Sequence, residues 1–396
     1  MDTKALGEFY KDKLLNEVEP FWFPRSLDTV NGGLYHCCAA DGTLVDTDKN
    51  VWAQGRMAWM LLTCYNSIEK RPEWMQYAES ALKFLEEKCV DPSDGRMYFH
   101  MTADGTPIRK RRYAYSECFA AIAWAAHYGA TGDTHSAERA RHWFDIYADI
   151  NFTPGKMAPK STGNRPGENL GCRMIMIVTA QELRRYLGDA DGFYTGWIDR
   201  CIDDLQRLFL HEDIQAVLEN VAPDGSVIDH FDERVLNPGH DIEGGWFVLE
   251  EARYRGGDKK LIEIGCKMID WALARGWDKK YGGLLYYTDV YNKPVQEYWH
   301  NMKFWWPHDE ALIGTCLAYV MTGDEKYAEW HQRIHDWAFE HLQDKEHGEW
   351  FGYCNQDGTT TNGLKGSMWK SFFHHPRALW CCAHYFGAIP APETKA

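Results

Sequence analysis

A polar or aromatic helix start recurs along this chain. The clearest example is 237–247, where Asn237 can cap a helix, Pro238 suits its first position, and a largely apolar run follows to Tyr254. Similar starts occur near 52–56, 115–117, 305–310 and 373–377, with a weaker one at 168–174. A spacing of about 55 to 70 residues between such starts indicates a repeat architecture.

Each recurring start follows a turn-rich segment and belongs to a helix–hairpin–helix unit. Hairpins are expected at 31–44, 94–105, 215–225, 281–287 and 348–358, with a Gly/Pro loop at 153–163. Further helices are expected at 4–17, 51–68, 73–89, 116–129, 135–150, 168–186, 190–210, 258–275 and 324–342.

One such unit cannot bury its own apolar faces, so neighbouring units must pack together. Six inner and six outer helices closing into a ring predict an all-α fold, an (α/α)6 barrel, as a single domain over residues 1–396. The helices after the hairpins would form the inner layer, with their first turns and the hairpins around a pocket at one rim. An open helical solenoid is the alternative.

Composition narrows the class of ligand. The chain has 18 Trp, 21 Tyr and 18 Phe, and aromatic excess with many carboxylates is typical of proteins that handle carbohydrates. The net charge of −15 and the absence of a long basic run exclude a nucleic-acid surface, so we expect a small-molecule substrate. The segment 109–112 is the only run of basic residues, and a solvated turn is its simpler interpretation.

Twelve cysteines without a C-x-x-C pair indicate free buried thiols in a reducing compartment. The N-terminus lacks an apolar signal core, and no stretch reaches membrane-spanning length. We therefore expect a cytoplasmic protein without a membrane partner.

Two kinds of chemistry fit the side chains expected at the rim. Paired carboxylates among aromatic residues are typical of a glycoside hydrolase, whereas two histidines suit removal and return of a carbon-bound proton. His240, in the first turn of its helix, is expected to stay neutral there because a helix N-terminus disfavours the imidazolium. A metal site is not expected, because His240 and Glu243 lack the H-E-x-x-H pattern and His374 and His375 are adjacent.

Six segments together resemble the N-acyl-D-glucosamine 2-epimerase family, also called renin-binding proteins. They are 46–56 (DTDKNVWAQGR), 215–221 (QAVLENV), 237–247 (NPGHDIEGGWF), 303–311 (KFWWPHDEA), 348–353 (GEWFGY) and 373–377 (FHHPR). They occur over almost the whole chain and in the family's order. The family's fold is an (α/α)6 barrel, which agrees with the ring predicted from the repeats.

The resemblance implies epimerisation at C2 of a ring-opened sugar, here N-acetylglucosamine and N-acetylmannosamine. His240 and His374 would be the acid/base pair, Arg56 would bind the oxygen on C1, and Glu243 and Glu310 would orient the histidines or hydroxyls. The remaining expected substrate-binding residues are Trp52, Glu117, Trp305, Trp306, His308, Trp369 and Arg377. The resemblance also implies no metal or redox cofactor, a nucleotide such as ATP as an activator, and a homodimer.

Three sequence details bear on the substrate. Relatives that act on unmodified sugars carry an extra His on the helix matched by 171–175, and this chain has none there. His375 replaces an apolar residue of the family's F-H-x-P-R, and Gly244 and Gly245 follow Glu243, so either change could alter the pocket.

Three alternative functions remain. They are an epimerase or isomerase of mannose or cellobiose, a glycoside hydrolase, and a catalytically silent binding protein.

Overall fold

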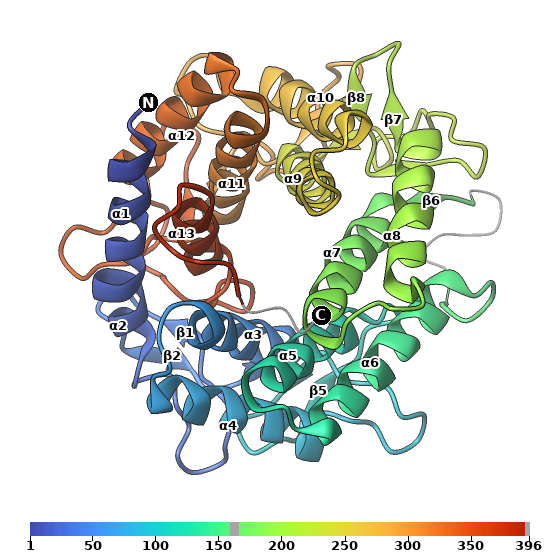
Figure 1. Cartoon of the computed structure of the whole chain (residues 1–396). Helices are drawn as coiled ribbons and strands as arrows, with labels where there is room; N and C mark the ends of the chain where they lie inside the picture. Colours follow the sequence, from blue (N-terminus) through green and yellow to red (C-terminus); the bar gives the residue numbers. More distant parts are fainter. Residues whose placement is uncertain (159–165, 393–396) are drawn as a thin grey trace.

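The fold is a ring of helices in two concentric layers (Figure 1). The computed structural model describes residues 1–158 and 166–392. The inner helices are α3 (Val51–Ser67), α5 (Tyr115–Thr131), α7 (Leu170–Leu187), α9 (Pro238–Tyr254), α11 (Trp305–Thr322) and α13 (His374–Tyr385). The outer layer holds α1 (Thr3–Lys13), α2 (Glu19–Trp22), α4 (Pro72–Lys88), α6 (Thr134–Phe152), α8 (Phe193–Asp204), α10 (Lys259–Gly276) and α12 (Glu325–His341).

These bounds agree closely with the expected helices, and the (α/α)6 barrel is confirmed. The helices expected at 4–17 and 190–210 are not α-helical throughout. Each ends in a π-helical turn, at Leu14–Val18 and at Leu205–Phe209. The Gly/Pro loop expected at 153–163 falls partly on 159–165, outside the described residues.

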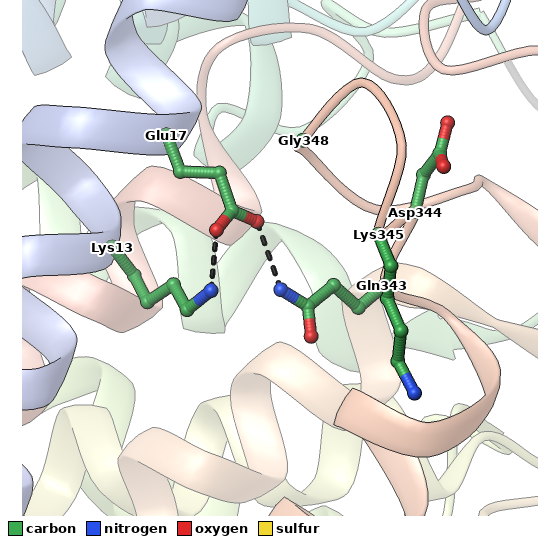
Figure 2. Close-up of a pocket in the computed structure, with 6 residues that line it drawn as sticks. All are labelled: Lys13, Glu17, Gln343, Asp344, Lys345 and Gly348. Atoms are coloured by element: carbon green, nitrogen blue, oxygen red, sulfur yellow. Dashed lines mark hydrogen bonds and ion pairs between the residues drawn. The ribbon is translucent and has the colours of Figure 1, made fainter.

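The ring closes, which excludes the open solenoid. Each inner helix contacts the next, and α13 returns to contact α3. Trp380 on α13 donates its indole N–H to Ser67 Oγ at the end of α3, at 2.9 Å. Figure 2 shows a second closure on the outer wall, where Glu17 accepts hydrogen bonds from Lys13 and, at 3.0 Å, from Gln343.

Short antiparallel strands connect neighbouring units at one rim. The pairs are β1 (Cys37–Cys38) with β2 (Leu44–Asp46), β6 (Glu168–Asn169) with β9 (Asn220–Val221), β7 (Leu210–His211) with β8 (Ala216–Val217), β10 (Val235–Leu236) with β11 (Thr288–Asp289), and β12 (Lys303–Phe304) with β13 (Tyr353–Cys354). A three-stranded sheet joins β3 (Lys49–Asn50), β4 (His100–Met101) and β5 (Pro107–Arg109). Several pairs bind one unit to the next, so they fix the rim where the inner helices begin.

The hairpin expected at 281–287 is not a strand pair. Leu284 makes one isolated bridge to Trp277, and the strand that follows, β11, pairs with β10 of the preceding unit. Gly282 and Gly283 have φ of 71°, so this segment is a tight left-handed turn rather than extended chain.

Buried lysines also follow the repeat: each forms an ion pair with an aspartate that lies shortly after the end of an outer helix. Lys49 lies 2.6 Å from Asp28, and Lys303 lies 3.0 Å from Asp278. Lys365 repeats the contact with Asp344 at 2.6 Å. These lysines are almost inaccessible to solvent, so each ion pair fixes a turn at the rim in the same way.

All twelve cysteines are free thiols, and every one except Cys266 is buried, as expected. Within residues 1–158 and 166–392, no helix combines the length and apolar character needed to cross a bilayer.

Candidate active site

His240 is held at the start of α9 by two contacts. The side-chain oxygen of Asn237 accepts from the backbone N–H groups of Gly239 and His240, which confirms the expected cap. Nδ1 of His240 lies 2.7 Å from Oε1 of Glu219. This contact requires Nδ1–H to donate, so Nε2 is the ring nitrogen left for chemistry.

The surroundings of His240 work against the neutral imidazole that its helix position favours. Burial and the helix start both disfavour the imidazolium, but the adjacent Glu219 carboxylate outweighs them and raises the pKa of His240 above its usual value. The sequence missed Glu219 as a site residue, although it lies inside the 215–221 segment.

His374, the first residue of α13, lies in a different electrostatic environment. Its Nδ1 is 2.7 Å from Oε1 of Glu310, and its side chain is only 10% exposed. Burial, followed by the positive charges of Arg377 and Arg56, holds the pKa of His374 well below its usual value. His374 is therefore a neutral imidazole at pH 7, with Nε2 free to accept a proton.

Arg377 joins the two carboxylates beneath His374. Its Nη2 lies 2.6 Å from Oε1 of both Glu243 and Glu310. The other oxygen of Glu310 accepts from the indole N–H of Trp246 at 2.8 Å. Glu310 thus orients His374 as expected, whereas Glu243 acts through Arg377.

The carboxylates of Glu243 and Glu310 and a ring nitrogen of His374 are close enough together to be considered as metal ligands. The Arg377 guanidinium already bonds both carboxylates, so it supplies the positive charge that an ion would supply. This arrangement favours a structural Arg–Glu pair over a metal centre.

Arg56 approaches the same cluster from α3. Its guanidinium carbon lies 4.1 Å from the ring centroid of Phe119 and 4.7 Å from that of Phe373. Its buried Nε has no hydrogen-bond partner among the described residues. A cation held by two rings, with donors unused by the protein, is well placed to bind a ligand oxygen.

Trp306 lies near both histidines. Its ring centroid is 4.9 Å from that of His240 and 5.8 Å from that of His374. Trp305 packs 5.4 Å from Tyr353 and 6.2 Å from His374. The two tryptophans therefore form an aromatic wall beside the acid/base candidates.

Trp52 and Trp369 form a second aromatic group, with centroids 6.0 Å apart. Trp52 also lies 5.5 Å from the Arg56 guanidinium, whereas Trp369 is 44% exposed. This group therefore extends from the buried cluster to the surface.

The structure does not bring two of the expected substrate-binding residues into the cluster. Glu117 accepts hydrogen bonds from Arg96 Nε at 2.7 Å and from the backbone N–H of Met97 at 3.0 Å. His308 uses Nδ1 on the backbone oxygen of Phe304 and accepts from the backbone N–H of Leu284. Each residue lies in the first turn of an inner helix and bonds a backbone N–H of the preceding rim turn, so both have a structural role there.

The two departures from the family pattern lie outside the pocket. His375 stacks 4.0 Å from Trp350 and bonds Asp309 at 2.9 Å. A Cβ on Gly245 would meet Gly265 and Ile269 of α10 at 3.0 Å, so glycine there permits close packing of α9 on the outer layer.

A cavity of about 240 Å³ adjoins the cluster. Arg56, Glu243 and Arg377 line one part of it, and the C-terminal residues of α9 and α13 line another. Neither His240 nor His374 is among its lining residues, so this cavity lies on the Arg56, Glu243 and Arg377 side of the cluster.

Comparison with known proteins agrees with this geometry. The family model described as N-acylglucosamine 2-epimerase (GlcNAc 2-epimerase) matches residues 33–378. The chain belongs to the N-acylglucosamine 2-epimerase family. It is 34% identical over 391 residues to N-acylglucosamine 2-epimerase of Mus musculus, covering 96% of this chain and 92% of the relative. The human enzyme of that name is 32% identical over 389 residues, covering 96% and 90%.

A solved structure, cellobiose 2-epimerase from Bacillus thermoamylovorans B4167, superposes with a TM-score of 0.82 at 22% identity and covers 96% of this chain and 99% of its own. At this identity the likeness shows the barrel fold. Membership of this 2-epimerase family makes the protein an isomerase.

Proposed function

We propose that this protein interconverts N-acetylglucosamine and N-acetylmannosamine by proton transfer at C2. The observation that carries the proposal is the position of His240 and His374 beside Trp306, each with Nδ1 held 2.7 Å from a carboxylate. Their surroundings lower the pKa of His374 and raise that of His240. Two groups whose environments separate their pKa values are suited to act as a base and an acid.

The proposed reaction begins with the ring-opened sugar. Neutral His374 removes the C2 proton through Nε2, while Arg56 binds the C1 oxygen as it gains negative charge in the enediolate. Protonated His240 then returns a proton to the opposite face of C2. In the reverse direction the two histidines exchange roles.

The carboxylates fix the histidines for this exchange. Glu310 accepts from Nδ1 of His374 and Glu219 from Nδ1 of His240, so Nε2 is the reactive atom in both rings. The hydrolase alternative is not favoured, because Glu243 and Glu310 are both bonded to Arg377, so neither carboxylate is free to act on a glycosidic bond.

The test is proton NMR of the protein with N-acetylglucosamine in deuterated water. Appearance of N-acetylmannosamine with deuterium at C2 would support the proposal. Conversion of mannose or cellobiose without conversion of the N-acetyl sugar would refute the substrate but not the reaction. Release of reducing sugar from oligosaccharides would indicate a hydrolase.

We further propose that the enzyme is a cytoplasmic homodimer and that a nucleotide such as ATP acts as an activator. Epimerisation consumes no phosphoryl group, so a nucleotide has no role as a reactant. Light scattering tests the dimer, and turnover with and without ATP tests the activation.

A further inference from the structure

Three arginines before α5 form no ion pair with a carboxylate of the described residues. Within this run Lys110 pairs with Asp91 at 2.8 Å and with Asp94 at 2.5 Å. In the described part of the chain, no ion pair forms at the other three basic residues, which are Arg109, Arg111 and Arg112. The protein has a net charge of −15, so three neighbouring arginines without ion pairs form a local positive region on a negatively charged protein.

The arginines lie together and leave donors unused. Arg111 lies 4.3 Å from the ring centroid of Phe99, and Arg111 and Arg112 approach Tyr113 at 5.8 Å and 5.3 Å. Buried Nε atoms of Arg111 and Arg112 have no hydrogen-bond partner among the described residues. Leaving a buried N–H without a hydrogen bond costs free energy, and a ligand that supplies the acceptor removes that cost.

Proximity of like charges adds to this cost. Burial lowers the pKa of Arg111, and the neighbouring Arg109 and Arg112 lower it further. An anion between the guanidinium groups would remove the repulsion and accept the unused hydrogen bonds.

This basic cluster adjoins the candidate active site through a short series of aromatic contacts. The Arg111 guanidinium lies 5.9 Å from the Trp369 ring, which is 6.0 Å from Trp52. Trp52 in turn lies 5.5 Å from the Arg56 guanidinium. The cluster is therefore located where the exposed aromatic edge of the sugar site begins.

We infer that Arg109, Arg111 and Arg112 form an anion site that binds a phosphoryl group. Planar guanidinium groups match the geometry of phosphoryl oxygens, and the flanking rings limit competition from water. The phosphoryl group belongs either to a separate small molecule or to the sugar itself, and the two sources are distinguished by experiment.

The first arm measures binding of inorganic tripolyphosphate to the full chain by calorimetry at low salt, without sugar. Arg111→Gln is expected to weaken binding by about tenfold, because it removes a charged hydrogen-bond donor. Lys110→Gln is the matched control: it removes the adjacent charge, which Asp91 and Asp94 already balance, and is expected to change binding by less than about twofold. Arg112→Gln is a second test if Arg111→Gln fails to fold.

The second arm compares N-acetylglucosamine with N-acetylglucosamine 6-phosphate as substrates, and it rests on the proposed function. A lower KM for the phosphorylated sugar that is lost in Arg111→Gln places the phosphoryl group on the substrate. Tripolyphosphate binding without that preference places it on a separate ligand. Absence of both effects, or equal loss in Arg111→Gln and Lys110→Gln, overturns the anion site. Conversion of N-acetylglucosamine by the unaltered protein tests the proposed function separately.

Discussion

Oε1 of Glu219 lies 2.7 Å from Nδ1 of His240, and this carboxylate favours the imidazolium form of the ring. The corresponding partner of His374 is Glu310, also at 2.7 Å. The two pairs differ in burial and in the surrounding positive charge. His374 is 10% exposed and faces Arg377 and Arg56, whereas His240 is 36% exposed, so a carboxylate contact of the same length accompanies the opposite pKa shift.

Glu219→Gln is expected to lower the pKa of His240, because it removes the negative charge that stabilises the imidazolium. Loss of such a positioning partner typically reduces activity by about 10- to 100-fold. The measurement is the pH dependence of kcat together with NMR titration of His240. Glu212→Gln, an exposed carboxylate of the same region, is the control. An unchanged His240 titration in Glu219→Gln would contradict the assignment.

The pH profile should show a maximum that extends to both sides of about pH 6.5, the usual histidine pKa. His374 must be neutral, and its lowered pKa moves the acidic limb below the usual histidine value of about 6.5. His240 must be protonated, and its raised pKa moves the alkaline limb above that value. We expect kcat/KM to fall on both sides of this range. A narrow maximum at pH 6.5 would instead indicate two unperturbed histidines.

Arg56→Met is expected to reduce kcat by about 100- to 1000-fold, the effect typical of losing one donor to a developing oxyanion. Its apolar side chain can still pack between Phe119 and Phe373, so the fold should persist. The measurement is turnover with a thermal unfolding control. Arg71→Met is the matched variant, because its guanidinium also packs on a ring, that of Trp74, outside the cluster. Full activity of Arg56→Met would exclude the proposed role.

His308→Ala is expected to act on stability rather than on the chemical step. It removes both backbone contacts of the ring, and leaving the buried N–H of Leu284 without an acceptor costs about 1 to 3 kcal/mol. The measurement is denaturant unfolding, with KM determined on the folded fraction. His308→Gln, which can still accept from Leu284, should recover part of the loss. A raised KM at unchanged stability would instead indicate that His308 binds the substrate.

Much of the fold could be predicted because its signals are local. Caps, turns and apolar periodicity lie within each unit, and the regular spacing of the units implies a ring. The positions of His240, His374, Arg56, Glu243 and Glu310 followed from their motifs, and the structure brings all five into one cluster.

The sequence by itself determined the repeat, the inner and outer layers and the two histidines. Only the tertiary structure decided that Glu219 contacts His240, that Arg377 joins Glu243 to Glu310, and that His308 binds a turn. Arg377, Glu243 and Glu310 lie on three different units, whereas Glu219 and His308 make their contacts within one unit between a hairpin segment and the helix that follows it. In both cases the side-chain contacts depend on tertiary packing, and a pKa depends on every charge within a few ångströms regardless of sequence separation. The pKa shifts of the two histidines therefore depend on how the helices of the barrel pack together.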